Sequence, residues 1–296
     1  MKIAILGTGS MALAMCKLFE KILDSITVYG RDEQQLFDLQ NNSSNSKYFK
    51  YKFNLKFICN YLDNFNIKNE SKYDIIFYCL PVKCLSSFYY NPNCNIIYLC
   101  KGFKENYLYN QTKNHGILLG PSYADEIIEG AFTYFTFSSN NEKLLNLTKI
   151  LFSKIKQCKI FYSDSIKEIE LFGIYKNIIS VVCGILDTLE FPRNTVAAFI
   201  VRILWSTGIE CKDLRHPAGI GDIFLTCSSN KSRNYQFGMY LIKNNRINYD
   251  ILSEGFNSIK HIKNNAIITQ LNFFINNINT MNLEEKKTFL LDLIKN

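Results

Sequence analysis

The sequence predicts an α/β protein in two parts, a doubly wound parallel sheet followed by an all-α domain. Up to residue 163, short apolar runs with the length of buried strands alternate with stretches of helical character, as in a parallel sheet covered by helices. Beyond residue 163, apolar residues recur at helical spacing and no strand-like alternation returns. A length of 296 residues is near the size at which one core gives way to two. The predicted domains are therefore residues 1–163 and 164–296.

The hydrophobic content of 47% is ordinary for a globular protein and leaves enough apolar residues for a large core. No apolar run approaches the roughly 18 residues that a membrane span needs. The longest runs, 178–186 and 196–205, are too short, and Arg202 interrupts the second. The first ten residues, MKIAILGTGS, reach glycines where a signal peptide would continue its apolar region. We therefore expect a cytoplasmic protein without a membrane span.

The formal net charge of +8 comes from lysines spread along the chain, without a basic block interleaved with aromatic residues. Nucleic acid is therefore not a predicted partner. A moderate positive field favours anionic small molecules, although a surface rich in Lys and Asn explains the charge equally well. The ten cysteines include no C-x-x-C pair and the chain has only three histidines, which argues against disulfides and zinc. We expect free cysteines that pack as small apolar side chains, and no metal site.

A glycine motif at the start of the chain predicts a nucleotide-binding turn. Lys2–Leu6 has the composition of a short buried strand, and the segment GTGSMA leads from it into a predicted helix over Met11–Leu23. In a G-x-G-x-x-A motif, Gly7 permits the tight turn, Gly9 lets a pyrophosphate approach the backbone, and Ala12 allows close packing of helix on strand. The free N–H groups of the helix N-terminus then face the phosphates. The motif predicts a Rossmann-type domain that binds a dinucleotide.

The next predicted strand, Ser25–Tyr29, indicates which dinucleotide is bound. Enzymes specific for NAD usually have an acidic residue at the tip of this strand, where it holds the ribose hydroxyls. Here Tyr29 and Gly30 occupy the tip and Arg31 follows, and an arginine at this place can accept the 2′-phosphate of NADP. An exposed turn arginine is the alternative interpretation. Either NADPH or NADH fits, with NADPH slightly favoured.

After an irregular stretch, the rest of the first domain again alternates between predicted strands and predicted helices. Residues 33–72 are rich in Asn, Lys and Tyr and are predicted to be irregular, with an exposed loop over 41–46. The further predicted elements are strands at Tyr73–Leu80, Asn95–Cys100, Gly116–Leu119, Ala131–Ser138 and Cys158–Tyr162, and helices at Asp125–Gly130 and Glu142–Lys154. Strand carboxyl ends face the ligand in such sheets, so Lys101 and the segment Gly120-Pro121-Ser122 are candidate ligand contacts. A plain surface lysine is the alternative for Lys101.

Two features of the helical part suggest chemistry. Ser165 and Glu168 have the spacing of a capping box that starts a long apolar helix. Lys176, followed by Asn177, lies among the apolar residues of that helix. The lysine either extends outward along the surface or has a function that needs a buried amine, because burial lowers the pKa of a lysine towards neutrality.

The segment AGIGDIFLTCSSNKSRNYQFG, residues 218–238, combines two further signals. Its glycine turn presents the carboxylate of Asp222 ahead of an apolar run, which predicts a buried acid. Ser232, Arg233 and Asn234 then place a hydroxyl, a guanidinium and an amide together, and a guanidinium matches a phosphate in bidentate geometry. A polar surface loop is the alternative. With the glycine turn beside it, the segment predicts a site for a small phosphorylated substrate.

Taken together, these segments resemble the bacterial-type NAD(P)-dependent glycerol-3-phosphate dehydrogenases. The resemblance extends over most of the chain through the blocks MKIAILGTGS, VYGRD, CKGF, LGPSYADE, YKNIISVVCGI, PAGIGDIFLTCSSNKSRNYQFG and SEGF. Their order and spacing are more specific than any single block. The resemblance implies the reversible reduction of dihydroxyacetone phosphate to sn-glycerol 3-phosphate by NADH or NADPH, which supplies glycerophospholipid synthesis.

The resemblance also implies roles for individual residues. Lys176 would be the catalytic acid and base, with Lys101 and Asp222 beside it, and Arg233 and Asn234 would bind the phosphate. The implied substrate-binding residues are Lys101, Gly120, Ser122, Lys176, Asp222, Ser232, Arg233 and Asn234. The implied cofactor-binding residues are Gly7, Gly9, Ser10, Met11, Arg31, Lys101, Ala124, Arg233, Glu254 and, as a weaker contact, Leu252.

The chemistry of the reaction agrees with these residue types. Delivery of a hydride to a ketone needs a proton donor at the developing alkoxide and a positive environment around it. Lys176 can provide both, Lys101 can add charge, and Asp222 can orient the lysine or a substrate hydroxyl. None of the three histidines falls in the blocks that form the site, so a histidine-based dehydrogenase is not expected.

The sequence also departs from the family pattern. Gly9-Ser10-Met11-Ala12 stands where the family has Gly-Ser-Trp-Gly, and Phe172, Ile174 and Tyr175 replace small residues before the lysine. Two alternatives stay open: a related two-domain reductase of a non-phosphorylated keto acid, and a dinucleotide-binding protein without turnover. The crowded helix favours the second alternative, and the intact Lys, Asp and Ser-Arg-Asn set opposes it. The oligomeric state is also open, with a homodimer as one option.

Overall fold

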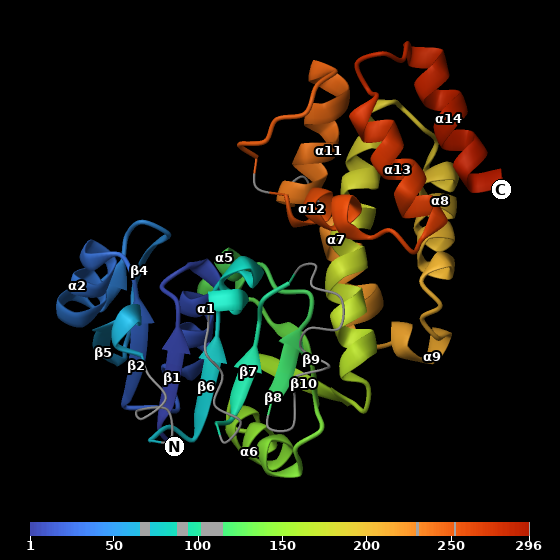
Figure 1. The fold of residues 1–296 in the computed structure, drawn as a ribbon. Coiled ribbons are helices and arrows are strands. Elements are labelled where there is room, and N and C mark those ends of the chain that lie inside the picture. The colour runs from blue at the N-terminus through green and yellow to red at the C-terminus, as the bar shows by residue number, and fades with distance from the viewer. Residues whose placement is uncertain (66–71, 88–93, 102–114, 229–230, 252, 296) are drawn as a thin grey trace. The chain divides into compact units, whose positions relative to one another are not determined.

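A computed structural model of the protein describes every residue except 66–71, 88–93, 102–114, 229–230, 252 and 296 (Figure 1). The described residues form two compact units. The first lies within Met1–Cys100 and Asn106–Glu170 and contains a sheet with helices. The second comprises Lys101 and Leu171–Asn296 and, where it is described, consists of helices and connections. The predicted fold class, an α/β sheet domain followed by an all-α domain, is confirmed.

The first unit is organised by one large sheet. Its strands are β1 (Ile3–Leu6), β2 (Ser25–Gly30), β5 (Lys56–Tyr61), β6 (Ile75–Tyr78), β7 (Ile96–Tyr98), β8 (His115–Leu119), β9 (Thr133–Ser139) and β10 (Cys158–Ser163). Over the described residues the strand order is β10-β9-β8-β7-β6-β1-β2-β5. From β5 to β8 all neighbours are parallel, in the order of a doubly wound nucleotide-binding sheet. β9 runs antiparallel to β8, and β10 runs parallel to β9.

Helices cover one face of this sheet, and the side chains between the sheet and these helices form the core of the first unit. Side chains alternate between the faces of a strand, and Ile5 of β1 and Phe77 of β6 point to the same face. There they pack in one apolar cluster with α1 (Ser10–Phe19), α5 (Ala124–Glu129) and α6 (Glu142–Phe152). The parallel register aligns the carboxyl ends of β1, β6 and β7, so the segments after these strands emerge at one edge of the sheet.

Most predicted elements of the first unit are present, with ends shifted by a few residues. The strand predicted at Tyr73–Leu80 is the shorter β6, for example, and the strand predicted at Ala131–Ser138 is β9. The first helix ends at Phe19 and not at Leu23, because the N–H groups of Ile22 and Leu23 close a turn onto the carbonyl of Phe19.

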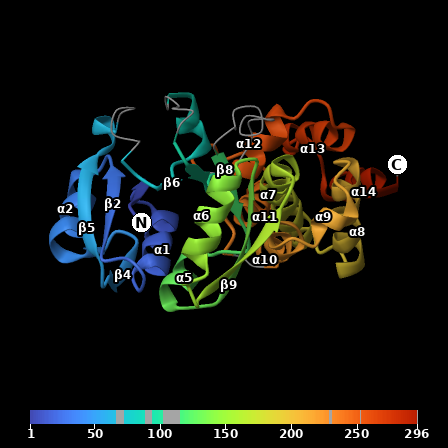
Figure 2. The same ribbon diagram turned by 90° about the horizontal axis from the view of Figure 1, so that it is seen from below.

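The prediction that residues 33–72 are irregular was wrong over the part that is described. This stretch contains α2 (Glu33–Asn42), a short hairpin of β3 (Ser44–Asn45) and β4 (Phe49–Lys52), and β5. Asp32 caps α2, since its carboxylate accepts the N–H of Gln35. β5 is an edge strand (Figure 2), and Lys56, Ile58 and Tyr61 are exposed on it, so it is not the buried apolar run by which a central strand is found.

The loop predicted at 41–46 is also not fully exposed, because Asn45 is buried. Its side-chain amide donates hydrogen bonds to the Thr8 carbonyl (3.2 Å) and to Gln35 Oε1 (3.1 Å). Asn45 thereby fastens the hairpin to the glycine-rich turn after β1. This anchor depends on tertiary contacts, which a run of polar residues does not reveal.

The second unit packs its helices around one apolar core. The described helices are α7 (Ile166–Thr188), α8 (Arg193–Ser206), α9 (Cys211–Leu214), α10 (Asp222–Cys227), α11 (Arg233–Asn244), α12 (Glu254–His261), α13 (Ala266–Asn276) and α14 (Leu283–Lys295), with a π-helical turn η3 (Pro217–Gly221) before α10. The predicted start of α7 is supported by the hydrogen bond from the Glu168 N–H to Ser165 Oγ (3.3 Å).

Helix α7 is the central helix of this unit. Among the described helices it alone is long and apolar enough to cross a membrane by length and mean hydropathy. The expectation concerned unbroken apolar runs, and α7 reaches its mean hydropathy with polar residues inside it. Of its apolar window, 94% is buried in the fold, which is the behaviour of the core helix of a globular unit.

Two glycines bring α7 and α11 together backbone to backbone. A Cβ atom at Gly184 of α7 would lie 2.1 Å from the carbonyl oxygen of Tyr235, and one at Gly238 of α11 would lie 2.1 Å from that of Val181. Neither position has room for a side chain. This close approach fixes the start of α11 against the middle of α7, where Lys176 and Asn177 lie.

Candidate active site

A buried ion pair lies at the centre of the second unit. Lys176 on α7 and Asp222 at the start of α10 are only 4% and 2% exposed, and Lys176 Nζ lies 2.6 Å from Asp222 Oδ2. The η3 turn sets the position of Asp222: Gly219 has a non-helical ψ of −106°, and a Cβ there would lie 2.7 Å from the Leu214 carbonyl oxygen. The long apolar helix therefore turns its lysine inward to a carboxylate and does not extend it to the surface.

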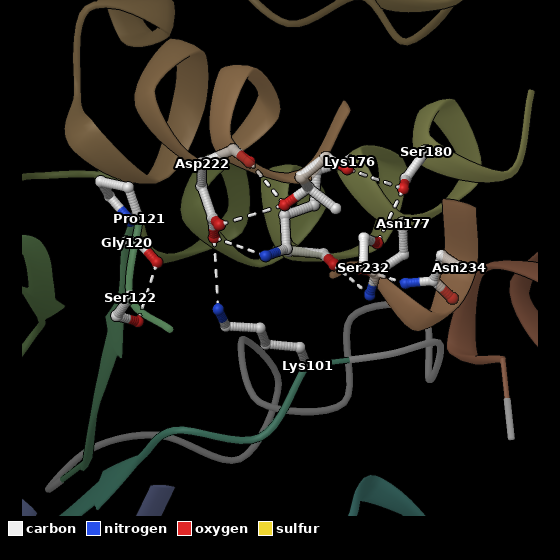
Figure 3. Close-up of polar contacts among 12 residues, drawn as sticks. Lys101, Gly120, Pro121, Ser122, Lys176, Asn177, Ser180, Asp222, Ser232 and Asn234 are labelled. Carbon is white, nitrogen blue, oxygen red and sulfur yellow. Dashed lines mark hydrogen bonds and ion pairs between the residues drawn. The ribbon is translucent and has the colours of Figure 1, made fainter. Parts of the chain in front are cut away.

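A second lysine shares the same carboxylate oxygen. Lys101 Nζ lies 3.3 Å from Asp222 Oδ2, and Figure 3 shows both ammonium groups pointing to this carboxylate. Burial lowers the pKa of Lys176 to about 8, because it outweighs the attraction of Asp222 and because Lys101 adds a repelling charge. The less enclosed Lys101 has its pKa raised, since the attraction of Asp222 and Glu254 outweighs the cost of burial. The site therefore holds two ammonium groups on one carboxylate, whose pKa values are shifted in opposite directions.

The Ser-Arg-Asn segment forms the N-terminus of α11. Ser232 is its N-cap and accepts the N–H of Tyr235 on Oγ (3.4 Å). Ser232 and Asn234 are buried, whereas the Arg233 side chain is exposed. A helix N-terminus with an adjacent guanidinium can bind an anionic group, because its first N–H groups point outward and its dipole is positive there.

A network of amides joins this helix start to the ion pair. Asn234 Nδ2 donates to Asn177 Oδ1 (2.9 Å), and Asn177 is the neighbour of Lys176 on α7. Asn177 Nδ2 donates in turn to Glu254 Oε2 (3.3 Å), while Asn234 Oδ1 accepts Ser253 Oγ–H (2.9 Å).

Glu254 is a buried carboxyl group on which three positively charged side chains of this unit act. Burial raises the pKa of its carboxyl, and the positive charges of Arg233, Lys101 and Lys176 act in the opposite direction. Arg233 and Lys176, from distant parts of the sequence, therefore act electrostatically on one group. The close approach of α12 depends on Gly255, where a Cβ would lie 2.3 Å from the Asn177 carbonyl oxygen.

The first unit contains the glycine-rich turn in the form that a dinucleotide needs. Gly7 has a φ of +116°, which favours glycine, and a Cβ at Gly9 would meet nothing within 4 Å. Gly9 is the N-cap of α1 and provides no side-chain acceptor, and the first turn of α1 has no acidic residue. Ser10 and Met11 are half-buried beside this open helix end. The backbone at Gly9 is therefore open to the approach of a phosphate, and no acidic residue in the first turn of α1 opposes it.

The tip of β2 differs from that of a typical NAD site. Arg31 is exposed, and the acidic residue that follows it, Asp32, is already bound in three ways: by the N–H of Gln35 (3.1 Å), by Gln35 Nε2 (2.6 Å) and by Lys47 Nζ (3.1 Å). The hydrogen bonds from Gln35 and Lys47 lower the pKa of Asp32 to about 2. The Asp32 carboxylate is therefore already hydrogen-bonded as the N-cap of α2.

The remaining candidates in the first unit lie after β8. Gly120 is buried, and a Cβ there would lie 2.4 Å from the Tyr134 carbonyl oxygen. Ser122 Oγ donates to the Gly120 carbonyl (3.0 Å), and Ala124 is half-buried at the start of α5. Leu252, the weakest candidate, lies outside the described residues.

Comparison with known proteins identifies the family. Sequence models of NAD-dependent glycerol-3-phosphate dehydrogenase match the chain at residues 2–145 for the N-terminal region and at 166–288 for the C-terminal region. The chain belongs to this family. It is 26% identical over 274 residues to the glycerol-3-phosphate dehydrogenase (NAD(P)+) of Polynucleobacter necessarius, which covers 81% of this chain and 80% of the relative.

Solved glycerol-3-phosphate dehydrogenases share the fold. The Plasmodium falciparum structure matches with a TM-score of 0.82 at 20% identity, covering 100% of this chain and 95% of that one. The Coxiella burnetii structure matches with a TM-score of 0.76 at 22% identity, covering 100% and 99%. As a member of the glycerol-3-phosphate dehydrogenase family, the chain is an oxidoreductase that uses a nicotinamide dinucleotide to reduce dihydroxyacetone phosphate.

In this dehydrogenase, the charged residues of the candidate site were predicted from the sequence, but some of the polar residues that contact them were not. Lys101, Lys176, Asp222, Asn234 and Glu254 are joined through the contacts above. Asn177 was noted only as the neighbour of the lysine, and Ser180 was not noted at all. Its spacing of four residues from Lys176, which places both on one face of a helix, is the signal that could have found it.

Proposed function

We propose that Lys176 is the general acid and base of this glycerol-3-phosphate dehydrogenase. The observation that carries the proposal is the buried contact of Lys176 Nζ with Asp222 Oδ2 at 2.6 Å, with Lys101 Nζ 3.3 Å from the same oxygen. Lys176 donates a proton from Nζ to the carbonyl oxygen of dihydroxyacetone phosphate as that oxygen gains negative charge. A pKa of about 8 suits this role, because the same amine then takes a proton back in the oxidation direction.

The other residues hold the reacting group in place. Asp222 keeps the ammonium of Lys176 oriented, and Lys101 adds a fixed positive charge that stabilises the developing alkoxide. Arg233 and Asn234, at the N-terminus of α11, bind the substrate phosphate, and Ser232 lines the same site as the N-cap of that helix. Gly120 and Ser122 contribute further substrate contacts. When bound, the nicotinamide supplies the hydride.

A second part of the proposal concerns the cofactor. We propose that the dinucleotide is held by Gly7, Gly9, Ser10, Met11 and Ala124, and that Glu254, Lys101 and Arg233 line its nicotinamide side, with Leu252 as a weaker contact. NADPH is preferred over NADH because Asp32 is committed to capping α2 while Arg31 is exposed beside it. The functional domains are 1–163 for the cofactor and 164–296 for the substrate, in a cytoplasmic enzyme.

The direct test is a spectrophotometric assay with dihydroxyacetone phosphate, run in parallel with NADH and with NADPH. We expect oxidation of both cofactors, faster with NADPH at limiting concentration, and competition by glycerol 3-phosphate. Turnover of a non-phosphorylated keto acid in preference to dihydroxyacetone phosphate would favour the related reductase. Tight cofactor binding without any turnover would favour the non-catalytic alternative.

Replacement of Arg31 by Ala is expected to raise the KM for NADPH tenfold or more and to leave the KM for NADH nearly unchanged. The guanidinium can pair with the 2′-phosphate, and only NADPH has that group. Initial rates at varied cofactor concentration measure both constants, so NADH serves as the internal control. An equal rise in both constants would mean that Arg31 contacts a part common to the two cofactors.

Replacement of Arg233 by Ala is expected to raise the KM for dihydroxyacetone phosphate by about 10- to 150-fold, since a hydrogen bond to a charged group contributes roughly 1.5–3 kcal/mol. Arg246→Ala is the matched control. It removes an arginine just past the other end of α11, where Nε donates to Tyr240 Oη (3.2 Å). Steady-state kinetics give the KM for dihydroxyacetone phosphate of both variants. An unchanged KM in Arg233→Ala would mean that this residue does not bind the phosphate.

A further inference from the structure

Ser180 connects three helices of the substrate unit through its hydroxyl. It lies on α7 four residues after Lys176 and is fully buried, at 0% exposure. Its Oγ donates to the carbonyl oxygen of Thr226 on α10 (3.0 Å) and lies 2.9 Å from Oγ of Ser232, the N-cap of α11 (Figure 3). One hydroxyl on the lysine helix thus contacts both the helix with Asp222 and the helix that begins with Arg233.

The chemistry of a hydroxyl fixes the direction of these bonds. Ser180 has one proton to donate, and the Thr226 carbonyl can only accept. The proton between the two serine hydroxyls must therefore come from Ser232. Ser232 Oγ in turn accepts the N–H of Tyr235 (3.4 Å). The result is a directed chain from the first turn of α11 through Ser232 and Ser180 to α10.

The chain continues to the backbone of Asp222. Thr226 Oγ1 donates to the Asp222 carbonyl oxygen (2.6 Å), so the residue that accepts from Ser180 is bonded within α10 to the residue that carries the acid. The Ser180 hydroxyl lies on the same α7 surface where Gly184 and Gly238 bring α7 and α11 together. Helix packing sets the distance between these helices, and the hydroxyl chain supplies a specific bond to each of them.

We propose that Ser180 is a positioning residue that couples phosphate binding to proton transfer. The inference rests on the proposed roles of Lys176, Asp222 and Arg233. Phosphate bound at the start of α11 restrains Ser232. The hydrogen bonds through Ser180 then keep α10, and with it Asp222, in a fixed position relative to Lys176. In this arrangement the proton of Ser232 is directed to Ser180, so Ser232 acts on the phosphate chiefly by holding the helix N-terminus in place.

The test compares a phosphorylated and a non-phosphorylated substrate. In Ser180→Ala we expect kcat/KM for dihydroxyacetone phosphate to fall at least tenfold, while the slow reduction of dihydroxyacetone, which has no phosphate, changes less than threefold. A loss of packing alone would reduce both rates in proportion. Ser258→Ala is the matched control, because Ser258 is also fully buried but donates only to the carbonyl of Glu254 on its own helix α12 (2.8 Å).

A second variant covers the case in which Ser180→Ala does not fold. Ser232→Ala breaks the same chain at its other end and is expected to show the same selective loss for the phosphorylated substrate. Calorimetric titration of each variant with glycerol 3-phosphate gives a readout that does not depend on turnover, and both are expected to bind at least tenfold more weakly than the unaltered enzyme. Equal losses on both substrates, or unaltered affinity for glycerol 3-phosphate, would overturn the role of Ser180. Failure of the unaltered enzyme to reduce dihydroxyacetone phosphate would overturn the proposed function itself.

Discussion

Replacement of Lys176 by Met is expected to lower kcat for the reduction of dihydroxyacetone phosphate by about 10²–10⁴-fold, the usual contribution of a general acid. Met keeps much of the length and apolar character of the lysine side chain, so α7 should retain its packing. The substitution removes the only proposed proton donor to the substrate oxygen. Cofactor affinity, measured by quenching of protein fluorescence on titration with NADPH, should stay within a factor of two, because the proposed dinucleotide turn lies in the other unit.

The chain provides a matched control for this experiment. Lys286 on α14 is also buried, at 7% exposure, and its ammonium donates to Asn245 Oδ1. Lys286→Met therefore removes a buried ammonium of the same unit that has no proposed part in the reaction, and its kcat should be close to that of the unaltered enzyme. A near-normal kcat in Lys176→Met, or an equal loss in both variants, would exclude Lys176 as the acid.

The fold was predictable where local pattern and burial agree. β1 and β6 are buried along their whole length, and each is a short unbroken apolar run that the sequence displays directly. The edge strand β5 is not such a run, since Lys56, Ile58 and Tyr61 are exposed and Asn60 interrupts its apolar residues. The hairpin after α2 was missed for a similar reason: its anchor is a buried Asn45, and asparagine usually marks an exposed loop.

The charged residues of the candidate site could be predicted from the sequence, but the contacts between them could not. Lys176 and Asp222 attract notice because a charge inside an apolar segment needs a partner. Their pairing, and the sharing of one oxygen with Lys101, depend on three segments that only the folded unit brings together. Ser180 is a small polar residue in a helix, and in the sequence only its spacing of four residues from Lys176 marks it. The positioning role proposed for it rests on hydrogen bonds to two other helices, which only the folded unit shows.

Replacement of Asp222 by Asn is expected to lower kcat at pH 7.5 at least tenfold and to change its pH dependence. Reduction needs the protonated form of Lys176, so in the unaltered enzyme kcat should be constant at low pH and fall as the pH rises through about 8, the pKa of Lys176. Asp222 raises that pKa by attraction, against the opposing effects of burial and of Lys101. Without the carboxylate, the pKa drops and the fall in kcat begins at a lower pH.

The sign of this shift separates an electrostatic role from a merely structural one. Lys101→Met removes the charge that lowers the pKa of Lys176, so its kcat profile should extend to higher pH, opposite to that of Asp222→Asn. In the oxidation direction both shifts keep their sign, while the rate rises with pH because the unprotonated amine is then the active form. Profiles of kcat from pH 5.5 to 9.5 for the three proteins provide the measurement. Parallel losses without opposite displacements would mean that Asp222 and Lys101 shape the site without setting the proton affinity of Lys176.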